Sequence, residues 1–495
     1  MSDVCLVLEG TFPYVRGGVS SWVYNLVKAL PNIEFSVLLI SSERDEARTY
    51  KYPIPDNITG IQEIFLHEYR ESRDIRRRRP HRWETLERFY GELWEGRFDS
   101  FGDIAKLFMN EPEGSIGWRE FFFSKRSWDN LERLYQTHDA KNSFIDYFWT
   151  WRFTHLPLYN IFATQIPRAR VYHTISTGYA GILGAIAKIR NRAPLMLTEH
   201  GIYTNERKIE IISSEWIFEE SFGHGVRGAG ASFFKQWWIN LFGLMSRVTY
   251  HYSDEIITLY SGNQLLQLED GAPPEKLSII PNGISIDAFS GFKCAFPKES
   301  DALYIGFVGR VVPIKDVKTF IKAVKIVKDR IPNAKVLILG PTDEDPAYYQ
   351  ECRILTRMLS LDDTITFTGP INVKEYYPGL DVVVLTSVSE AQPLVILEAH
   401  TQGVPCVATD VGACSEMLYG RTEEDRALGK SGLITNLASP QETADAICRI
   451  LLDPDLRRTM GEAGRKRTGL FYNETDLNFK YFDLYRHYMN VNIGR

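Results

Sequence analysis

The sequence predicts an α/β protein built from two doubly wound, Rossmann-like domains. Strand-like apolar runs alternate with helix-like segments in both halves of the chain, which is typical of parallel sheets. A chain of 495 residues is also too long for one ordinary core. A hydrophobic content of 44% with 24% charged residues indicates a folded, globular chain. We expect the two domains to face each other across a cleft.

The first domain is expected over residues 1–290. A strand at 3–8 leads into a glycine-containing turn and a helix that ends near residue 30. Residues 68–165 are rich in aromatic and charged side chains at helical spacing, so they predict a helical insertion whose aromatic residues mainly pack. Further strands of this domain are expected near 34–40, 170–174, 194–198, 255–259 and 277–281.

The second domain is expected over residues 291–470, after a polar linker around 283–300. Residues 471–495 complete the chain with an aromatic helix at about 474–490, which we expect to pack across the two domains. The strands of the second domain are expected near 303–308, 335–340, 364–368, 381–386 and 404–408.

Composition and charge narrow the function classes. A net charge of −6 gives no general case for nucleic-acid binding. The basic run Arg76–Arg79 is either a solvated turn or a docking patch for an anionic partner. Six scattered cysteines without a paired spacing favour reduced thiols and a cytoplasmic location. No run approaches the roughly 20 apolar residues of a membrane span, so action at a membrane would need a partner protein.

Two glutamates follow the apolar run that starts at Val382. Glu390 lies on the loop after this run, and Glu398 lies in a helix that opens at Pro393. In open α/β sheets, ligands bind at the carboxyl ends of the strands, where a helix N-terminus favours a phosphate. Carboxylates there can accept hydrogen bonds from sugar hydroxyls. The alternative for each glutamate is a residue that only complements the helix dipole or caps a loop.

Cations follow another predicted strand. Gly309 and Arg310 end the run from Ile305, and Lys315 comes five residues later. An arginine fork and a lysine point charge at this edge can clamp a diphosphate, although a surface ion pair is the alternative.

The first domain offers a histidine and a glycine pair. His200 follows the strand near 194–198, and Gly17 and Gly18 precede the first helix, where backbone amides can approach a phosphate or sugar. The glycines lack the third member of a dinucleotide fingerprint, which counts against NAD. The acidic run Asp343–Asp345 matches a metal-binding pattern, but its place before a helical segment favours helix-start acids.

Together these motifs resemble the retaining, GT-B-fold glycosyltransferases of family 4. The resemblance covers about residues 250–465 and rests on the order of the motifs, which include Ile280–Ile284, Phe307–Arg310 with Lys315, and Glu390 with Glu398. The N-terminal stretch Leu8–Ser20 and the segment His200–Tyr203 narrow it to glycosyltransferases of bacterial Pel exopolysaccharide synthesis.

The resemblance implies a role for each motif residue. Arg310 and Lys315, with Gly309, would bind the donor diphosphate, and Glu398 would hold the ribose. Glu390 and His200 would contact the donor sugar. The backbone at Gly17, Gly18, Leu394 and Val395 would complete the phosphate site. The donor implied is UDP-glucose, the acceptor is a growing polysaccharide, and no metal is expected because cations and the helix dipole stabilise the leaving group. A membrane-bound synthesis and export complex would be the partner.

Three positions depart from the family pattern. Asp316 stands where the family has glycine, Gln392–Pro393 stands where it has an aromatic residue followed by glycine or proline, and Gly412–Ala413 stands where it often has two glycines. No pair of carboxylates suits a glycosidase-type double displacement, so a front-face mechanism fits better. The alternatives are a GT-B epimerase or phosphorylase, and a non-catalytic nucleotide-sugar-binding subunit of a secretion complex.

Overall fold

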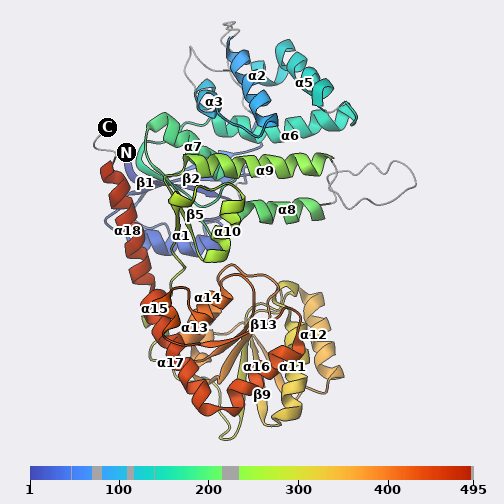
Figure 1. Cartoon of the computed structure of the whole chain (residues 1–495), viewed down its shortest axis with the longest axis vertical. Coiled ribbons are helices and arrows are strands. Elements are labelled where there is room, and N and C mark those ends of the chain that lie inside the picture. Colours follow the sequence, from blue (N-terminus) through green and yellow to red (C-terminus); the bar gives the residue numbers. More distant parts are fainter. Residues whose placement is uncertain (46, 70–80, 109–115, 139, 215–232, 492–495) are drawn as a thin grey trace, which may run out of the picture. The chain divides into compact units, whose positions relative to one another are not determined.

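A computed structural model of the chain describes residues 1–45, 47–69, 81–108, 116–138, 140–214 and 233–491 (Figure 1). The basic run Arg76–Arg79 lies outside these residues. The fold divides into two compact units. The first unit comprises Met1–Thr258, Gln264–Ser278 and Tyr481–Arg495, and the second comprises Leu259–Asn263 and Ile279–Lys480.

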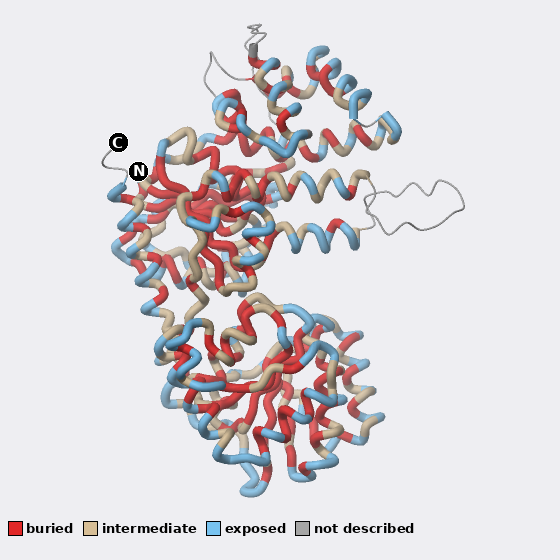
Figure 2. Tube along the Cα trace, in the orientation of Figure 1, coloured by how far each residue is buried: buried red, intermediate tan, exposed pale blue. Residues whose placement is uncertain are grey.

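The first unit is built on a seven-stranded sheet in the order β3-β2-β1-β4-β5-β6-β7. Parallel pairing joins β3 to β2, β2 to β1, β1 to β4, β4 to β5 and β5 to β6. Its central strands are apolar on both faces because helices cover them, and they appear as buried segments in Figure 2. The strands are β1 (Ser2–Glu9), β2 (Phe35–Ser41), β3 (Ile58–Phe65), β4 (Ala169–Thr174), β5 (Leu195–Glu199), β6 (Glu255–Thr258) and β7 (Leu277–Ile279).

Helices of the first unit include the insertion that its composition predicts. The insertion follows β3 and consists of α2 (His81–Trp94), α3 (Phe101–Leu107), α4 (Trp118–Phe123), α5 (Lys125–His138) and α6 (Phe144–Phe162). Ser143 caps α6 by accepting a hydrogen bond from the backbone N–H of Asp146. The other helices are α1 (Gly18–Ala29), α7 (Tyr179–Asn191), α8 (Tyr203–Ser213), α9 (Phe233–Tyr252) and α10 (Ser261–Glu269).

The second unit contains a six-stranded parallel sheet in the order β10-β9-β8-β11-β12-β13. The strands are β8 (Leu303–Val308), β9 (Ala334–Leu339), β10 (Ile365–Gly369), β11 (Val382–Leu385), β12 (Cys406–Thr409) and β13 (Gly432–Thr435). The helices are α11 (Val317–Arg330), α12 (Pro346–Met358), α13 (Leu394–Thr401), α14 (Cys414–Tyr419), α15 (Glu423–Arg426), α16 (Pro440–Leu452), α17 (Pro454–Phe471) and α18 (Glu474–Val491).

Strand order reverses once in each sheet, between β1 and β4 in the first unit and between β8 and β11 in the second. This is the doubly wound topology that the alternating pattern predicts, and ligands bind such sheets at the point of reversal. Two edge strands were not predicted. β3 has exposed polar residues, and β13 starts with glycine and has only Leu433 and Ile434 as apolar residues, so neither gives a strong apolar run.

The C-terminal helix forms where the aromatic pattern predicts it. α18 begins in the second unit, and its residues from Tyr481 belong to the first. Tyr481 and Tyr485 are buried in the first unit, where the hydroxyl of Tyr485 lies 2.7 Å from His173 Nδ1. All six cysteines are free thiols, and within the described ranges no helix is both long and apolar enough to cross a membrane.

A buried ion pair joins two helices of the second unit. Arg467 of α17 is fully buried and donates from Nε to Asp425 Oδ1 at 2.6 Å. Its remaining nitrogens donate to the carbonyls of Leu418, Asp425 and Gly429 and to the hydroxyl of Ser431. Each hydrogen-bonding group of this guanidinium is therefore compensated, as burial of a charge requires.

Replacing Arg467 by methionine should destabilise the second unit by about 3–5 kcal/mol, because Asp425 and the carbonyls would stay buried without a donor. Urea unfolding followed by circular dichroism measures this loss. Arg458→Met is the matched control: it lies on the same helix, is 63% exposed and pairs with Glu462, so it should cost less than about 1 kcal/mol. Equal losses in the two variants would contradict the assignment.

Candidate functional site

The candidate site of the second unit starts at the carboxyl end of β8. Gly309 follows this strand with φ 154°, and Gly340 follows the neighbouring β9 with φ 146°. A Cβ atom on Gly340 would lie 2.3 Å from the carbonyl oxygen of Gly309. Only glycine therefore fits at residue 340, and the two strand ends are held in close backbone contact.

Lys315 and Glu390 meet at the reversal point of this sheet. Lys315 ends a short 3₁₀ turn (Pro313–Lys315) after β8, and Glu390 lies in the loop between β11 and α13. The Lys315 ammonium donates to Glu390 Oε1, which also accepts from Ser387 Oγ at 2.6 Å. The side chains are 20% and 13% exposed. They form a largely desolvated ion pair, where a charged interaction is stronger than at the surface.

Backbone contacts hold the two loops together. The N–H of Val388 donates to the carbonyl of Ile314 at 2.9 Å, and the hydroxyl of Thr386 donates to the carbonyl of Lys315 at 3.1 Å. Gly412, with φ 54°, packs under Glu390, since a Cβ there would lie 2.2 Å from the Glu390 carbonyl oxygen. Gly412 is thus required by geometry. Ala413, which follows it, donates from its backbone N–H to the carbonyl of Ala391 at 2.8 Å.

Glu398 lies in α13, the helix that follows β11 and the loop of Glu390. Its Oε2 accepts a hydrogen bond from the hydroxyl of Tyr377 at 2.6 Å. Burial raises the pKa of Glu398, while the Tyr377 hydrogen bond and the charge of Lys374 oppose that rise. Tyr377 itself is fully buried. Within the described residues, no hydrogen bond is recorded to the second oxygen of Glu398, which leaves it able to accept from a ligand hydroxyl.

Two of the departures from the family pattern have clear structural roles. Asp316 adopts the left-handed conformation, with φ 44°, and its carboxylate caps α11 by accepting from the N–H of Thr319 at 3.2 Å. Its charge therefore complements a helix N-terminus. Gln392 accepts from the N–H of Asn282 at 2.7 Å and donates to its carbonyl at 2.9 Å. These two hydrogen bonds hold the Pro281–Gly283 segment against the loop after β11.

Arg310 is more exposed than Lys315. Its guanidinium pairs with Glu344, and the two side chains are 52% and 49% exposed. Asp345, next to Glu344, caps α12 by accepting from the N–H of Tyr348 at 2.9 Å. The acidic run is thus divided between a cap and a partner for Arg310, as expected for helix-start acids.

In the first unit, Gly17 and Gly18 begin α1 with φ values of 91° and 47°. His200 follows β5, and its ring packs edge-on against Trp22 at 4.7 Å between centroids. Because Trp22 lies one turn into α1, the start of this helix and the end of β5 are neighbours. Burial lowers the pKa of His200 to about 4, so the imidazole is neutral at physiological pH.

Sequence reasoning missed the roles of two glutamates at strand ends of the first unit, the half-buried Glu9 and the buried Glu199. Glu9 ends β1 and accepts from the Tyr203 hydroxyl at 3.0 Å. Glu199 accepts from the Tyr250 hydroxyl at 2.8 Å and from Gln267 at 2.9 Å. Burial raises the pKa of both carboxyl groups. Glu9 could have been found as an acidic residue at the carboxyl end of the first strand, at the β1–β4 reversal.

The structure thus brings Lys315 and Glu390 into contact in the second unit, with Gly309 and Arg310 on the same loop. Leu394 and Val395 open α13, and Glu398 follows one turn later. Gly17, Gly18 and His200 belong to the first unit. Tyr377 and Gln392 were not predicted, since their partners are set by contacts between distant segments.

Comparison with known proteins places this fold in a class. A sucrose-phosphate synthase from Thermosynechococcus elongatus superposes with a TM-score of 0.58 at 17% identity, covering 98% of this chain and 99% of that one. Anabaena Alr3699/HepE in complex with UDP gives a TM-score of 0.59 at 14% identity, covering 97% and 98%. The predicted α/β, GT-B architecture with two Rossmann-like domains is confirmed.

The chain belongs to the family described as "Domain of unknown function (DUF3492)", which matches residues 2–275. Residues 293–467 match the family described as "Glycosyl transferases group 1". A D-inositol 3-phosphate glycosyltransferase of Kribbella flavida is 29% identical over 222 residues, or 42% of this chain and 48% of that protein. A second, from Corynebacterium jeikeium, is 30% identical over 200 residues, or 38% and 46%. The chain thus spans about half the length of these curated relatives.

Replacing His200 by asparagine should reduce the loss in free energy of unfolding that occurs as the pH falls below 6.5. Between pH 6.5 and about 4 the unfolded chain protonates this residue while the folded chain does not. Stability therefore falls as pH drops through this window, by up to about 1.4 kcal/mol per pH unit for one histidine. Urea unfolding at several pH values measures the slope. His487→Asn, an exposed position on α18, is the control, and an unchanged slope in His200→Asn would contradict the prediction.

Proposed function

We propose that the protein is a retaining glycosyltransferase that transfers a sugar, glucose in our assignment, from a UDP-sugar to a growing polysaccharide. The observation that supports this most strongly is the Lys315–Glu390 pair at the β8–β11 reversal, with Arg310 and Glu398 on the adjoining segments. Cations for a diphosphate and carboxylates for hydroxyl groups meet where doubly wound sheets bind ligands.

In this proposal the diphosphate lies between the β8 loop and the start of α13. Arg310 and Lys315 supply positive charge, and the N–H groups of Leu394 and Val395 add the partial charge of a helix N-terminus. Gly309 keeps the backbone close enough for contact. Glu344, the partner of Arg310, is half exposed, so a phosphate can displace it at low cost. These groups would stabilise the departing UDP without a metal ion.

The carboxylates have separate roles in the proposal. Glu398 would accept from the ribose hydroxyls with the oxygen that Tyr377 does not occupy. Glu390, fixed by Lys315 and Ser387, would accept from hydroxyls of the donor sugar. Complexes of Anabaena Alr3699/HepE with UDP and with UDP-glucose support a UDP-sugar as donor. His200, with Gly17 and Gly18, would contact the donor from the first unit.

A front-face mechanism fits these residues. Glu390 shares one oxygen with Lys315 and Ser387, which suits positioning better than nucleophilic attack. The phosphate oxygen that leaves the sugar would accept the acceptor's proton, and the protein would supply charge stabilisation and alignment. The configuration at the anomeric carbon would be retained.

The acceptor is assigned from two segments of the N-terminal half of the chain. The Leu8–Ser20 stretch and the His200–Tyr203 segment resemble the Pel exopolysaccharide glycosyltransferase PelF. We therefore assign the reaction to Pel polysaccharide synthesis for biofilms, in the cytoplasm, next to a membrane-bound synthesis and export complex.

Binding of UDP to the purified chain tests the donor site. A nucleotide at 100 times its dissociation constant should stabilise the fold by about 2.7 kcal/mol, read as a rise in melting temperature. Lys315→Ala and Arg310→Ala should each weaken UDP about 10–100-fold, the value of one or two charge-assisted hydrogen bonds. Neither substitution should change the binding of uridine, which lacks phosphates.

The matched control is Lys325→Ala, since Lys325 is a lysine of α11 that is 41% exposed and pairs only with Asp329 among the described residues. Turnover of UDP-glucose should survive EDTA and follow the same order of variants. If UDP and UDP-sugars leave the melting temperature unchanged, or if both clamp variants turn over within about threefold of the parent, the proposal is wrong.

Glu398 can be tested separately with a donor analogue. Glu398→Ala should weaken the binding of UDP about 10-fold or more, through loss of a charged hydrogen bond. The same substitution should weaken the binding of 2′-deoxy-UDP and 3′-deoxy-UDP less, because each analogue already lacks one of the hydroxyls. Isothermal titration of the parent and the variant with all three nucleotides gives the coupling between Glu398 and each hydroxyl. A zero coupling for both hydroxyls would remove Glu398 from the ribose site.

A further inference from the structure

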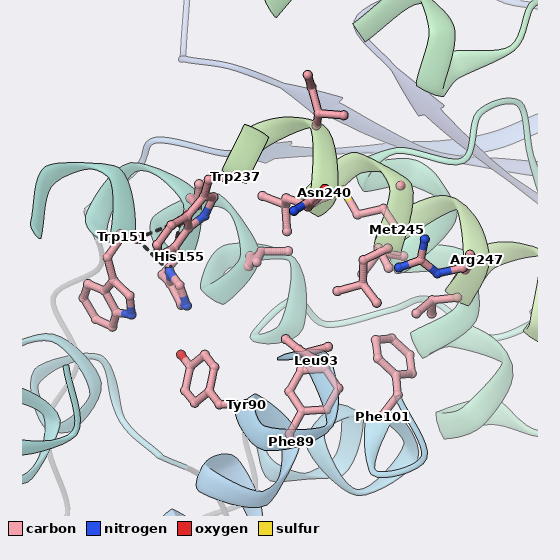
Figure 3. Close-up of a pocket in the computed structure, with 18 of the residues that line it drawn as sticks. Phe89, Tyr90, Leu93, Phe101, Trp151, His155, Trp237, Asn240, Met245 and Arg247 are labelled. Atoms are coloured by element: carbon pink, nitrogen blue, oxygen red, sulfur yellow. Dashed lines mark hydrogen bonds between the residues drawn. The ribbon is translucent and has the colours of Figure 1, made fainter. Parts of the chain in front are cut away.

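A second cavity lies entirely within the first unit, away from every residue assigned above. Its volume is about 660 Å³; it is partly open to solvent and is lined by helices of the insertion together with α7, α8 and α9 (Figure 3). Protein interiors normally leave few voids larger than a water molecule. A chamber of this size is in the range of small-molecule sites.

The lining of this cavity is mainly aromatic and aliphatic. It includes Phe89, Leu93, Phe101, Trp151 and Trp237. Such a surface offers little hydrogen bonding to a sugar or nucleotide. An engineered apolar cavity of only about 150 Å³ binds benzene, so a larger one of this character is suited to a hydrocarbon.

The cavity is elongated along α9. Trp237 and Arg247 both line it and are ten residues apart on this helix, which corresponds to about 15 Å along the axis. Figure 3 shows Tyr90, His155 and Trp151 toward one end and Arg247 with Phe101 toward the other, with Phe89 and Leu93 between them. An extended chain suits this shape better than a compact ring system.

The two ends differ in charge. Arg247 is half-buried, and among the described residues no hydrogen bond or ion pair joins its guanidinium to another group, so its five donors are open to a ligand. Its neighbour Asp270 accepts from the hydroxyl of Thr204 at 2.5 Å, and Lys208, one turn after Thr204, also lines the cavity. This end therefore has two cations against one carboxylate.

The opposite end carries no charge at neutral pH. His155 donates from Nδ1 to the Trp151 carbonyl at 2.7 Å, and burial lowers its pKa to about 4. Tyr90 beside it is a neutral phenol, since burial raises its pKa. The cavity thus combines a cationic end with a long, uncharged, apolar body.

We propose that this cavity binds a single-chain anionic amphiphile, with the hydrocarbon along α9 and the acidic head group at Arg247. A fatty acid and an isoprenyl phosphate share this chemistry. This site is separate from the donor site, so binding of the amphiphile and binding of UDP can be tested independently of each other.

A chain-length series on the intact protein tests the hydrocarbon part. Saturated carboxylates of eight to sixteen carbons should bind about fourfold more tightly per added methylene, which corresponds to about 0.8 kcal/mol. The gain should stop once the cavity is filled. Titration below the micellar concentration gives each Kd. An affinity that does not depend on chain length, or no binding by any member, would overturn the proposal.

Fluorescence quenching places the chain. A brominated carboxylate should quench tryptophan emission, and Trp237→Phe should remove part of that quenching. Trp128→Phe, which alters a 48% exposed tryptophan outside the cavity lining, should leave the quenched fraction unchanged. Equal effects of the two substitutions would assign binding to the surface and overturn the proposal.

Head-group variants test the role of Arg247. Laurate should bind at least tenfold more tightly than dodecanol or dodecyltrimethylammonium, and Arg247→Gln should abolish this preference while dodecanol still binds. Arg119→Gln, at an exposed arginine outside the lining, is the control. Palmitate and farnesyl phosphate in parallel distinguish the two sources. Equal binding of laurate and dodecanol to the parent would overturn the proposal.

Discussion

The parallel register of β8 and β11 is the constraint on which the candidate donor site depends. Val384 pairs with Phe307, so both strands leave the sheet at the same level. Strand order reverses between them, and their connecting helices diverge to opposite faces. The two loops are therefore neighbours at an edge that no crossover helix closes. Residues 75 positions apart, Lys315 and Glu390, come into contact for this reason.

Charge compensation explains how such an edge is stable before a ligand binds. A lysine at 20% exposure and a glutamate at 13% would each lose solvation without a partner. Their mutual contact offsets that loss, and the hydroxyl of Ser387 shares the carboxylate. In the proposed complex, a diphosphate at Lys315 would add a second anion to a cation that is already paired. Arg310 would then balance the charge, since its exposed pair with Glu344 is the easier one to exchange.

The sequence predicted the sheets, the insertion and the positions of the motif residues, because strand periodicity and strand-end motifs are local. It did not predict what holds those residues. Tyr377, which orients Glu398, lies 21 positions before it, and Gln392 clamps a backbone segment 110 positions away. These contacts depend on how distant segments pack. Edge strands β3 and β13 were missed because their apolar residues are interrupted by glycine and polar residues and so carry little apolar signal.

The insertion shows why composition alone does not separate packing from binding. Its aromatic residues were expected to pack, and many do: Phe121 stacks on Trp151 at 5.7 Å, and Tyr147 meets Trp237 at 5.3 Å. Rigid rings that meet edge to face hold helices apart where no side chain fills the gap. The same rings line the cavity of the first unit. Arg247 lies half-buried on the wall of this cavity, so its guanidinium keeps contact with water, and in our proposal an acidic head group would take the place of that water.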